Sequence, residues 1–179
     1  LTIFLLFTIS CSQSGTPKPK AFIKLDLPDK RYNIFNSSCP FYFDVPTYSS
    51  INNMKEDCFF DIVFDQLNAK IHVTYFPILD NLYEHTEQSR DFAYKHNIVA
   101  DRITEKLYIN DSLKVYGVFY DYAGVTATAS QFYLTDSVNH FFRGALYFNT
   151  EVSDSILPLN NFLKKDVKHL IETFRWKNH

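Results

Sequence analysis

The cysteines are the residues of this chain whose chemistry follows most directly from their positions. Cys11 comes after ten uncharged residues, LTIFLLFTIS, and before a polar stretch with two prolines, SQSGTPKPKA. A short apolar run that ends at a small residue and a cysteine is typical of a bacterial lipoprotein signal, in which the cysteine becomes the acylated N-terminus. The run is shorter than the ~20 apolar residues that a membrane span needs. We therefore expect residues 1–10 to be a partial lipoprotein signal peptide and Cys11 to be lipidated.

The alternative for this segment is a buried N-terminal strand, which the polar residues after Cys11 fit poorly. If Cys11 carries lipid, Cys39 and Cys58 remain as an even pair in an oxidising compartment. A disulfide across that loop would stabilise the fold by about 3 kcal/mol. We predict that Cys39 and Cys58 are bonded, with two buried thiols as the alternative.

One group of acid, base and hydroxyl residues lies close together near the end of a predicted helix. It combines YKH at 94–96 with Asp101 and Arg102. A cation at a helix C-terminus is stabilised by the helix dipole, and His96 lies at the helical period that packs on a sheet. These facts favour a structural role over a catalytic one.

The segment TDSVNH at 135–140, followed by Arg143, is a second such group. Asp, Ser and Asn side chains bond nearby backbone groups in turns. Catalytic Ser, His and Asp residues rarely adjoin one another in one tight turn. We interpret the segment as a hairpin turn.

Several kinds of site are excluded or disfavoured by the rest of the sequence. The four glycines have no phosphate-binding spacing, and there is no Gly-x-Ser-x-Gly motif. The histidines show no ligand spacing, so a zinc site is disfavoured, although one built from remote histidines stays open. The net charge of −2 provides no basic surplus for nucleic acid. We expect no cofactor, no metal, no nucleic acid and no enzymatic activity.

Hydrophobic periodicity predicts the elements that position these residues. Alternation predicts strands at 41–45, 58–64, 70–76, 113–122, 125–135 and 140–149, the last three as an antiparallel meander. Three- and four-residue steps predict helices at 80–97, capped by Asp80 or Asn81, and at 159–175. Residues 98–109 fit helix or strand. The fold class is therefore α+β: an antiparallel sheet packed by a central amphipathic helix and a C-terminal helix.

Residues 11–21 are expected to form the lipidated cysteine and a flexible tether, and residues 22–179 a single globular domain. Phe and Tyr are abundant, with 18 and 12 copies. Such a surplus could line a glycan or peptide groove, but the alternation of the aromatic residues favours a β-rich core.

Several short stretches together resemble a known family. They are CPFYF at 39–43, SRDFAYKH at 89–96 with AD at 100–101, VYGVFYD at 115–121, QFYLTDS at 131–137, HFFRG at 140–144 and HLIET at 169–173. In this order they resemble the gliding motility lipoprotein GldD family of Bacteroidetes, from about Pro17 to Lys177. The resemblance implies a lipoprotein needed for surface gliding and type IX secretion, with no known enzymatic activity or cofactor. The family's one transferable functional position is the lipidated cysteine, which corresponds to Cys11. The order of elements is also similar to the PsbP/Mog1 sandwich, an analogy of topology alone.

We therefore expect a non-enzymatic accessory protein. Its lipid would hold it in the cell envelope, at the periplasmic face of the outer membrane, where the tether presents the domain to other gliding-motility and type IX secretion proteins. Residues 12–16 lack the acidic cluster that many surface-exported lipoproteins carry, which favours the periplasmic face. The stretch VTATAS at 125–130 is a candidate flat contact strand, with an ordinary sheet strand as its alternative.

The alternative function is an envelope small-ligand (glycan or peptide) binding module or hydrolase. It would require His96, Asp101, Tyr120 or Asp121 to converge in a cleft. No spacing of a nucleophile and a base in the sequence favours it.

Overall fold

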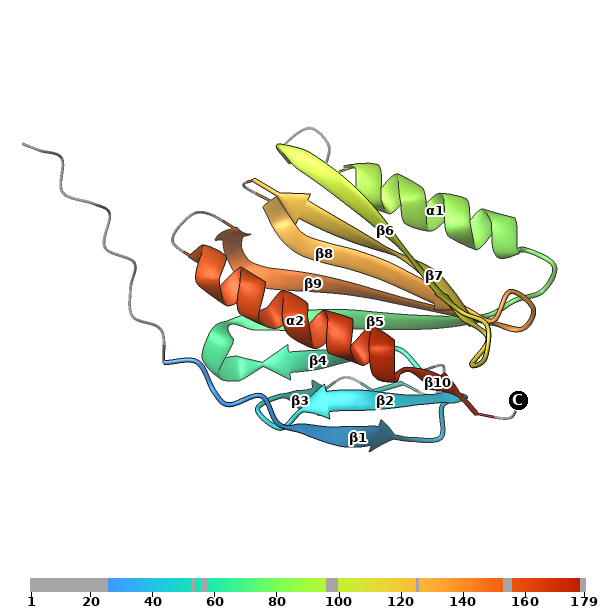
Figure 1. Cartoon of the computed structure of the whole chain (residues 1–179), viewed down its shortest axis with the longest axis horizontal. Coiled ribbons are helices and arrows are strands. Elements are labelled where there is room, and N and C mark those ends of the chain that lie inside the picture. The colour runs from blue at the N-terminus through green and yellow to red at the C-terminus, as the bar shows by residue number, and fades with distance from the viewer. Residues whose placement is uncertain are drawn as a thin grey trace, which may run out of the picture.

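A computed structural model describes residues 26–52, 54–55, 58–95, 100–124, 126–152 and 156–177 (Figure 1). Cys11, the predicted signal peptide and the predicted tether lie outside the described residues. The described chain forms two antiparallel sheets and two α-helices, which confirms the α+β class. Neither helix is long and apolar enough to cross a membrane.

The larger sheet has seven strands in the order β3-β4-β5-β9-β8-β7-β6, and every neighbouring pair is antiparallel. Its strands are β3 (Ser50–Asn52), β4 (Phe60–Phe64), β5 (Ala69–Pro77), β6 (Arg102–Asn110), β7 (Val115–Ala123), β8 (Thr126–Thr135) and β9 (His140–Val152). The last three form the predicted meander. The ambiguous segment 98–109 contains most of strand β6 and no described helix.

The smaller sheet combines the first and last described strands. Its order is β1 (Tyr32–Asn36), β2 (Phe41–Pro46) and β10 (Arg175–Trp176), and both pairs are antiparallel. The alternation at 41–45 predicts β2, whereas β1 and β10 are not expected from the sequence. Trp176 faces Phe41 across the β10–β2 pair, so the C-terminal residues lie beside an N-terminal strand.

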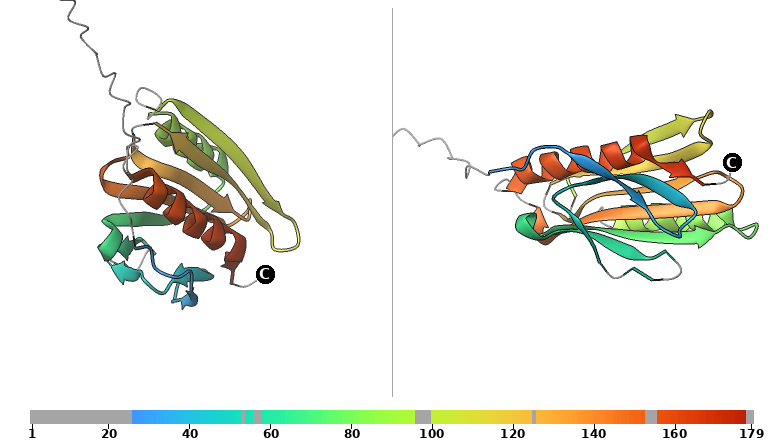
Figure 2. Two further views of the ribbon diagram at one scale, coloured as in Figure 1. Left: turned by 60° about the vertical axis from the view of Figure 1, so that its left-hand side comes forward. Right: turned by 90° about the horizontal axis from the view of Figure 1, so that it is seen from below.

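The helices cover opposite faces of the larger sheet (Figure 2). Helix α1 (Leu82–Tyr94) lies within the predicted range 80–97, and α2 (Leu157–Thr173) begins and ends two residues before the predicted 159–175. Asn81 occupies the N-cap position of α1, but its Oδ1 accepts a hydrogen bond from the Leu79 N–H rather than from the helix. Helix α2 shares its face of the sheet with the smaller sheet.

Phenylalanine fills the core between α2 and the two sheets. The fully buried rings in this core include Phe41, Phe43, Phe60, Phe64, Phe132, Phe142 and Phe174. Phe41 and Phe142 meet edge to face with their centroids 4.9 Å apart, and the Phe142 and Phe174 centroids are also 4.9 Å apart. Each such ring removes a large apolar area from water, so the aromatic surplus serves the core, as the alternation of the strands predicts.

A disulfide joins Cys39 to Cys58 at the edge of this core, with a Cα–Cα distance of 5.8 Å. Cys39 lies just before β2 and Cys58 just before β4. The bond therefore ties the smaller sheet to the larger one.

Candidate functional site

The structure does not assemble the first predicted acid–base group into a site. His96 lies outside the described residues. The Tyr94 hydroxyl donates a 2.6 Å hydrogen bond to Glu105 on β6, and this bond raises the pKa of Tyr94. The backbone N–H of Asp101 bonds the carbonyl of Ala123 at 2.9 Å. Tyr94 therefore links α1 to strand β6.

Tyr120 and Asp121 lie on opposite faces of the larger sheet because they are neighbours in β7. Tyr120 is buried in the cluster that contains Ala93 of α1. The Asp121 carboxylate accepts a 2.5 Å bond from Lys164 of α2 on the other face. The two side chains cannot act in one cleft, so the structure lacks a site that combines Tyr120 with Asp121.

An aromatic cleft of about 540 Å³ opens beside the disulfide. Its lining contains Ser38, Pro40, Cys58, Phe59, Tyr75, Phe76 and Pro77. This lining includes no carboxylate, and no group of three or more His, Cys, Asp or Glu in the described part of the chain could hold a metal ion. The cleft therefore offers a place for apolar packing rather than a catalytic pair of acids.

The segment TDSVNH forms the hairpin turn that the sequence predicts. Asp136 Oδ1 accepts hydrogen bonds from the backbone N–H groups of Val138, Asn139 and His140 at 3.0, 2.8 and 2.8 Å. Burial raises the pKa of this carboxyl, but the three bonds outweigh burial and leave it below its ordinary value. The His140 ring stacks on Trp176 and its Nδ1 bonds the Tyr75 hydroxyl at 2.7 Å. These contacts join the β8–β9 turn to the rest of the fold.

The candidate contact strand at 125–130 is not one, and the structure shows its alternative, an ordinary sheet strand. Val125 lies outside the described residues, and Thr126, Thr128, Ala129 and Ser130 are buried. They belong to β8, which lies inside the larger sheet between β9 and β7. Small β-branched residues here allow close packing within the fold and are not available to a partner.

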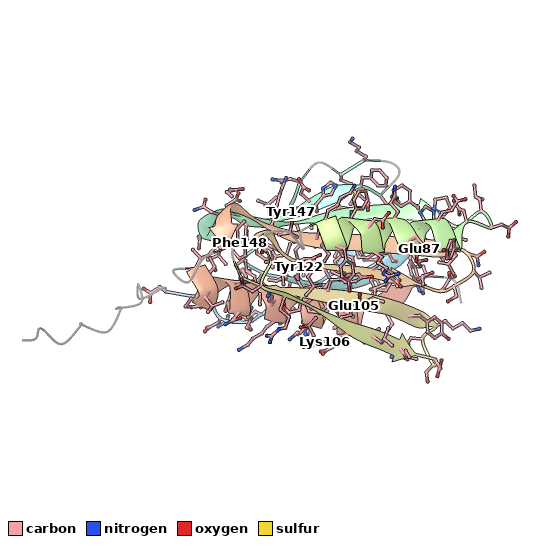
Figure 3. The ribbon with its side chains drawn as sticks, turned by 90° about the horizontal axis from the view of Figure 1, so that it is seen from above. Glu87, Glu105, Lys106, Tyr122, Tyr147 and Phe148 are labelled. Carbon is pink, nitrogen blue, oxygen red and sulfur yellow. A yellow bond between two sulfur atoms is a disulfide. The ribbon has the colours of Figure 1, made fainter. Side chains whose placement is uncertain are left out.

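Polar side chains also lie on the α1 side of the larger sheet, and Figure 3, which looks onto the β6 edge, labels Tyr122, Tyr147 and Glu105. Arg143 of β9 donates a 2.6 Å hydrogen bond to Gln131, and its guanidinium lies 4.7 Å from the Phe92 ring. Burial lowers the pKa of Arg143. The contact with Phe92 makes Arg143 part of the packing of α1 on the sheet.

A polar seam between α2 and the N-terminal region is the arrangement that sequence reasoning missed. We define it as Lys30, Tyr32, Asp44, Tyr48, Asp166, His169 and Thr173. At its centre, Asp166 is 1% exposed and accepts bonds from the Tyr32 hydroxyl at 2.9 Å, the Tyr48 hydroxyl at 2.6 Å and Lys30 Nζ at 2.6 Å. Lys30 Nζ also bonds the Phe162 carbonyl at 3.0 Å and lies 3.3 Å from the centroid of its ring.

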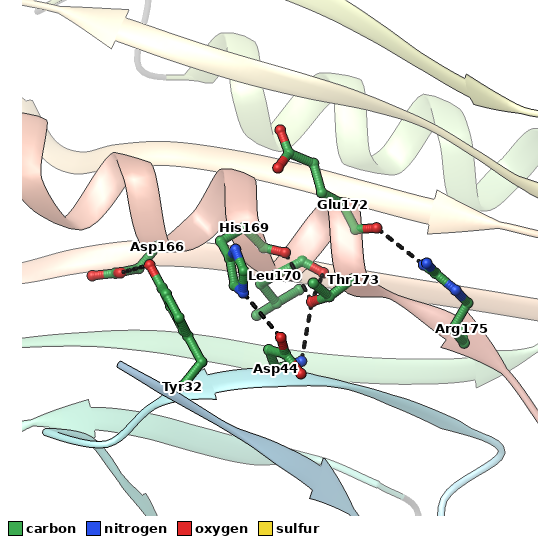
Figure 4. A network of polar contacts seen from close by, with 8 residues as sticks. All are labelled: Tyr32, Asp44, Asp166, His169, Leu170, Glu172, Thr173 and Arg175. Carbon is green, nitrogen blue, oxygen red and sulfur yellow. Dashed lines mark hydrogen bonds and ion pairs between the residues drawn. The ribbon is translucent and has the colours of Figure 1, made fainter. Parts of the chain in front are cut away.

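The seam continues along α2 toward the smaller sheet (Figure 4). His169 Nε2 lies 3.0 Å from Asp44 Oδ2, and the His169 ring stacks on Tyr32 with centroids 3.7 Å apart. Thr173 Oγ1 accepts the Asp44 N–H at 3.1 Å and donates to the His169 carbonyl at 2.8 Å. These contacts fix β1 and β2 against one side of α2.

The electrostatics of the seam favour a joint over a reactive site. Burial, followed by the bond to Asp166, raises the pKa of Tyr32 and Tyr48, so both hydroxyls remain donors. Burial lowers the pKa of Lys30, while Asp166 acts in the opposite direction. Each charged or polar group is bonded to a neighbour within the seam. These contacts can hold residues 26–31 against helix α2.

One signal in the sequence points toward this seam. Asp166 lies among Phe162, Leu163, Val167 and Leu170 on the apolar face of the predicted helix. A carboxylate in that position must be bonded once it is buried, because an isolated buried charge is costly. The partners could not be identified in this way, since Lys30 and Tyr32 are more than 130 residues away along the chain.

Comparisons with known proteins complete this description. A family model described as gliding motility lipoprotein GldD matches residues 12–176, a range that includes every described helix and strand. A search of curated proteins found no match.

Proposed function

This chain belongs to the GldD family of gliding motility lipoproteins, and from that membership we propose that it is a membrane-anchored, non-enzymatic accessory of the gliding and type IX secretion machinery. Its role in this proposal is to bind or assemble other proteins of that machinery. The family match supports the link to gliding motility. The association with type IX secretion rests on the resemblance of the sequence motifs.

The anchor in this proposal is acyl lipid on Cys11. Two or three acyl chains make membrane attachment effectively permanent, whereas one chain binds only weakly. The position follows from the apolar run before Cys11 and the polar, proline-containing residues after it. We place the protein in the outer membrane, and the lack of an acidic cluster at residues 12–16 favours its periplasmic face.

The observation that carries the proposal is the polar seam, together with the family match. Residues 12–25 connect Cys11 to the described chain and can reach at most about 50 Å. The chain then enters at residues 26–31, where Lys30 is bonded to Asp166 of α2. A lipid on Cys11 would therefore hold the whole fold close to the membrane through a fixed joint.

Replacement of Cys11 tests the anchor. We expect Cys11→Ala to lose labelling by a radioactive fatty acid, to leave the membrane fraction, and to reduce colony spreading and secretion of type IX cargo. Ser12→Ala is the matched control and should behave as the unmodified protein. Normal membrane attachment and motility of Cys11→Ala would contradict the proposed anchor.

Crosslinking in intact cells tests the accessory role. Reaction of the lipidated protein in its native envelope, followed by mass spectrometry of the membrane fraction, should recover gliding or secretion proteins. Recovery of peptidoglycan fragments alone would argue instead for a ligand-binding or hydrolytic function.

A further inference from the structure

Strand β6 is a long free edge of the larger sheet (Figure 1). It pairs with β7 over nine residues without a register shift, from Arg102 facing Ala123 to Asn110 facing Val115. No described strand pairs with its other side. Such an edge presents unpaired N–H and C=O groups, and proteins usually protect it with a proline, a bulge or a short strand. Among the described residues, the protection that β6 carries is that of its charged side chains.

One face of β6 exposes apolar side chains. Leu107 is 76% exposed and Ile109 is 66% exposed. Both lie on the face that carries α1, since Leu107 faces Val118, which packs with Ala93 of that helix. Two large aliphatic side chains in alternate positions on a free edge form a short apolar strip.

The other face of β6 borders a cleft of about 140 Å³ between the strand and α2. Its lining includes Lys106, Tyr108 and Phe119 from the sheet and Lys168, Ile171 and Glu172 from the helix. Phe119 and Ile171 are buried and form an apolar floor. The cleft is therefore a side-chain pocket directly beside the unpaired backbone of β6.

The charges around this cleft favour an acidic ligand. Among the described residues, neither Lys106 nor Lys168 forms an ion pair, and both border the cleft together with a single carboxylate, Glu172. Lys106 is labelled on β6 in Figure 3. The surplus positive charge lies where side chains of an added strand would project.

We infer that the free edge of β6 binds an extended, acidic-apolar segment of a partner protein as an eighth strand of the larger sheet. Backbone groups of β6 pair with the segment, as in other complexes formed by strand addition. On the α2 side, the segment places an apolar side chain in the cleft and carboxylates near Lys106 and Lys168. On the other side, it places apolar side chains against Leu107 and Ile109. This inference rests on the proposed accessory role, whose binding surface it specifies.

A second copy of this chain is a poorer occupant. If two β6 strands paired, Lys106 and Lys168 of both copies would lie on the same side of the joined sheet. Like charges at facing positions of a sheet are destabilising. An acidic segment from another protein avoids this repulsion.

A pair of synthetic peptides tests the edge directly. With the full-length lipidated protein in detergent micelles, capped VDVLVDV should bind at least tenfold more tightly than capped VKVLVKV, as measured by calorimetry. Hydrogen exchange with mass spectrometry should show that VDVLVDV protects the amides of residues 102–110. Equal binding of the two peptides, no binding, or protection of another segment would overturn the inference.

Surface variants separate edge binding from other effects. Leu107→Asn should weaken VDVLVDV binding, whereas Leu79→Asn should not, although Leu79 is equally exposed at 77%. The double variant Lys106→Glu/Lys168→Glu should bind VKVLVKV in preference to VDVLVDV. If Leu107→Asn instead abolished a concentration-dependent dimer and left peptide binding unchanged, the edge would belong to a second copy and the inference would be wrong.

The two proposals can fail separately. Membrane attachment and motility of the Cys11 variant report on the anchored accessory role without reference to β6. A photoreactive residue at position 107, compared with one at exposed Tyr83 of α1, reports on the edge in cells. We expect position 107 to be joined to one acidic-apolar segment of an envelope protein. Equal labelling from both positions would contradict a specific edge site.

Discussion

Asp166 shows how one buried charge can organise two distant parts of a chain. Its carboxylate lies on the packed face of α2, where loss of hydration is costly. Three donors from the N-terminal region compensate for that loss: Lys30, Tyr32 and Tyr48. Because Lys30 lies before β1, Tyr32 begins β1 and Tyr48 follows β2, the carboxylate does more than complete a helix face. It determines where the N-terminal segment lies.

We therefore predict a large effect of Asp166→Ala. Removal of the carboxylate leaves Lys30 and two tyrosine hydroxyls without their shared acceptor, and the free energy of unfolding should fall by about 3 kcal/mol. Urea denaturation followed by circular dichroism measures this change.

Asp29→Ala is the control for this prediction. The Asp29 side chain is 85% exposed and faces exposed Arg31 at 3.5 Å. Such a surface pair contributes less than about 1 kcal/mol, so the control should unfold almost as the unmodified protein does. Similar losses in both variants would show that Asp166 has no special role.

At the scale of elements, close approach between strands constrains the meander. A Cβ atom added at Gly117 of β7 would lie 2.0 Å from the Tyr133 carbonyl oxygen of β8. A Cβ added at Gly144 of β9 would lie 2.4 Å from the Phe132 ring. The first obstacle is backbone and the second is a side chain. The two glycines thus permit different kinds of contact, although both lie in the same meander.

Substitution of these glycines should separate the two kinds of contact. Gly144→Ala requires the buried Phe132 ring to shift and should cost about 1–3 kcal/mol. Gly117→Ala requires strands β7 and β8 to separate and should cost more than Gly144→Ala. Thermal unfolding of both variants gives the order, and a smaller loss for Gly117→Ala would refute this account.

The disulfide is the other constraint between elements. We predict that the double variant Cys39→Ala/Cys58→Ala loses about 3 kcal/mol of stability, since the loop between these cysteines becomes free in the unfolded chain. Melting of the unmodified protein with and without a reductant should show the same loss. Mass spectrometry after alkylation tests the bond itself, and two alkylated thiols in protein purified from the envelope would contradict it.

On the scale of the whole molecule, tyrosines are distributed through every packed layer and are kept neutral by burial. Burial is the first cause of a raised pKa in Tyr32, Tyr48, Tyr75, Tyr120, Tyr122 and Tyr133. These residues lie on both faces of the larger sheet. Deprotonation of these tyrosines at high pH therefore destabilises the packing on both faces of the larger sheet.

This distribution predicts the sign of the alkaline response. Above pH 10, the unfolded chain releases tyrosine protons that the folded chain retains, so stability is fully present below pH 10 and falls as the pH rises. The lowered pKa values of Lys30 and Arg143 act in the opposite direction, but these are two groups against six tyrosines. Absorbance at 295 nm should rise late and cooperatively, together with loss of the circular dichroism signal. A gradual rise near pH 10 with the fold intact would contradict this prediction.

Hydrophobic periodicity in the sequence predicted the helices and strands whose burial follows that periodicity. The amphipathic face of α2 and the alternation in β7, β8 and β9 were sufficient to locate these elements. Strand β10 was missed because Arg175 continues the helical period, whereas the chain leaves the helix at Phe174, which is extended with ψ 136° and buried beside Trp176. The end of the helix at this point depends on tertiary packing, for which the local sequence carries no signal.

The dependence on tertiary packing also explains why the polar seam and the burial of residues 125–130 were not predicted. Nothing local distinguishes residues 125–130 as an interior strand, because strand order decides their burial. Likewise, the partners of Asp166 come from the far end of the chain. The lipidation of Cys11 stays a prediction, and it could be made from sequence because a lipoprotein signal is a linear segment.

The smaller sheet carries a consequence for the timing of export. In a chain that crosses a membrane N-terminus first, β2 could not complete its pairing until Trp176 of β10 had emerged. Contacts between distant parts of a chain also slow folding. If Cys11 is acylated as we propose, acylation can therefore take place before the smaller sheet closes. A sheet that pairs Phe41 and Tyr42 with Trp176 and Arg175 therefore closes late in the biogenesis of the chain.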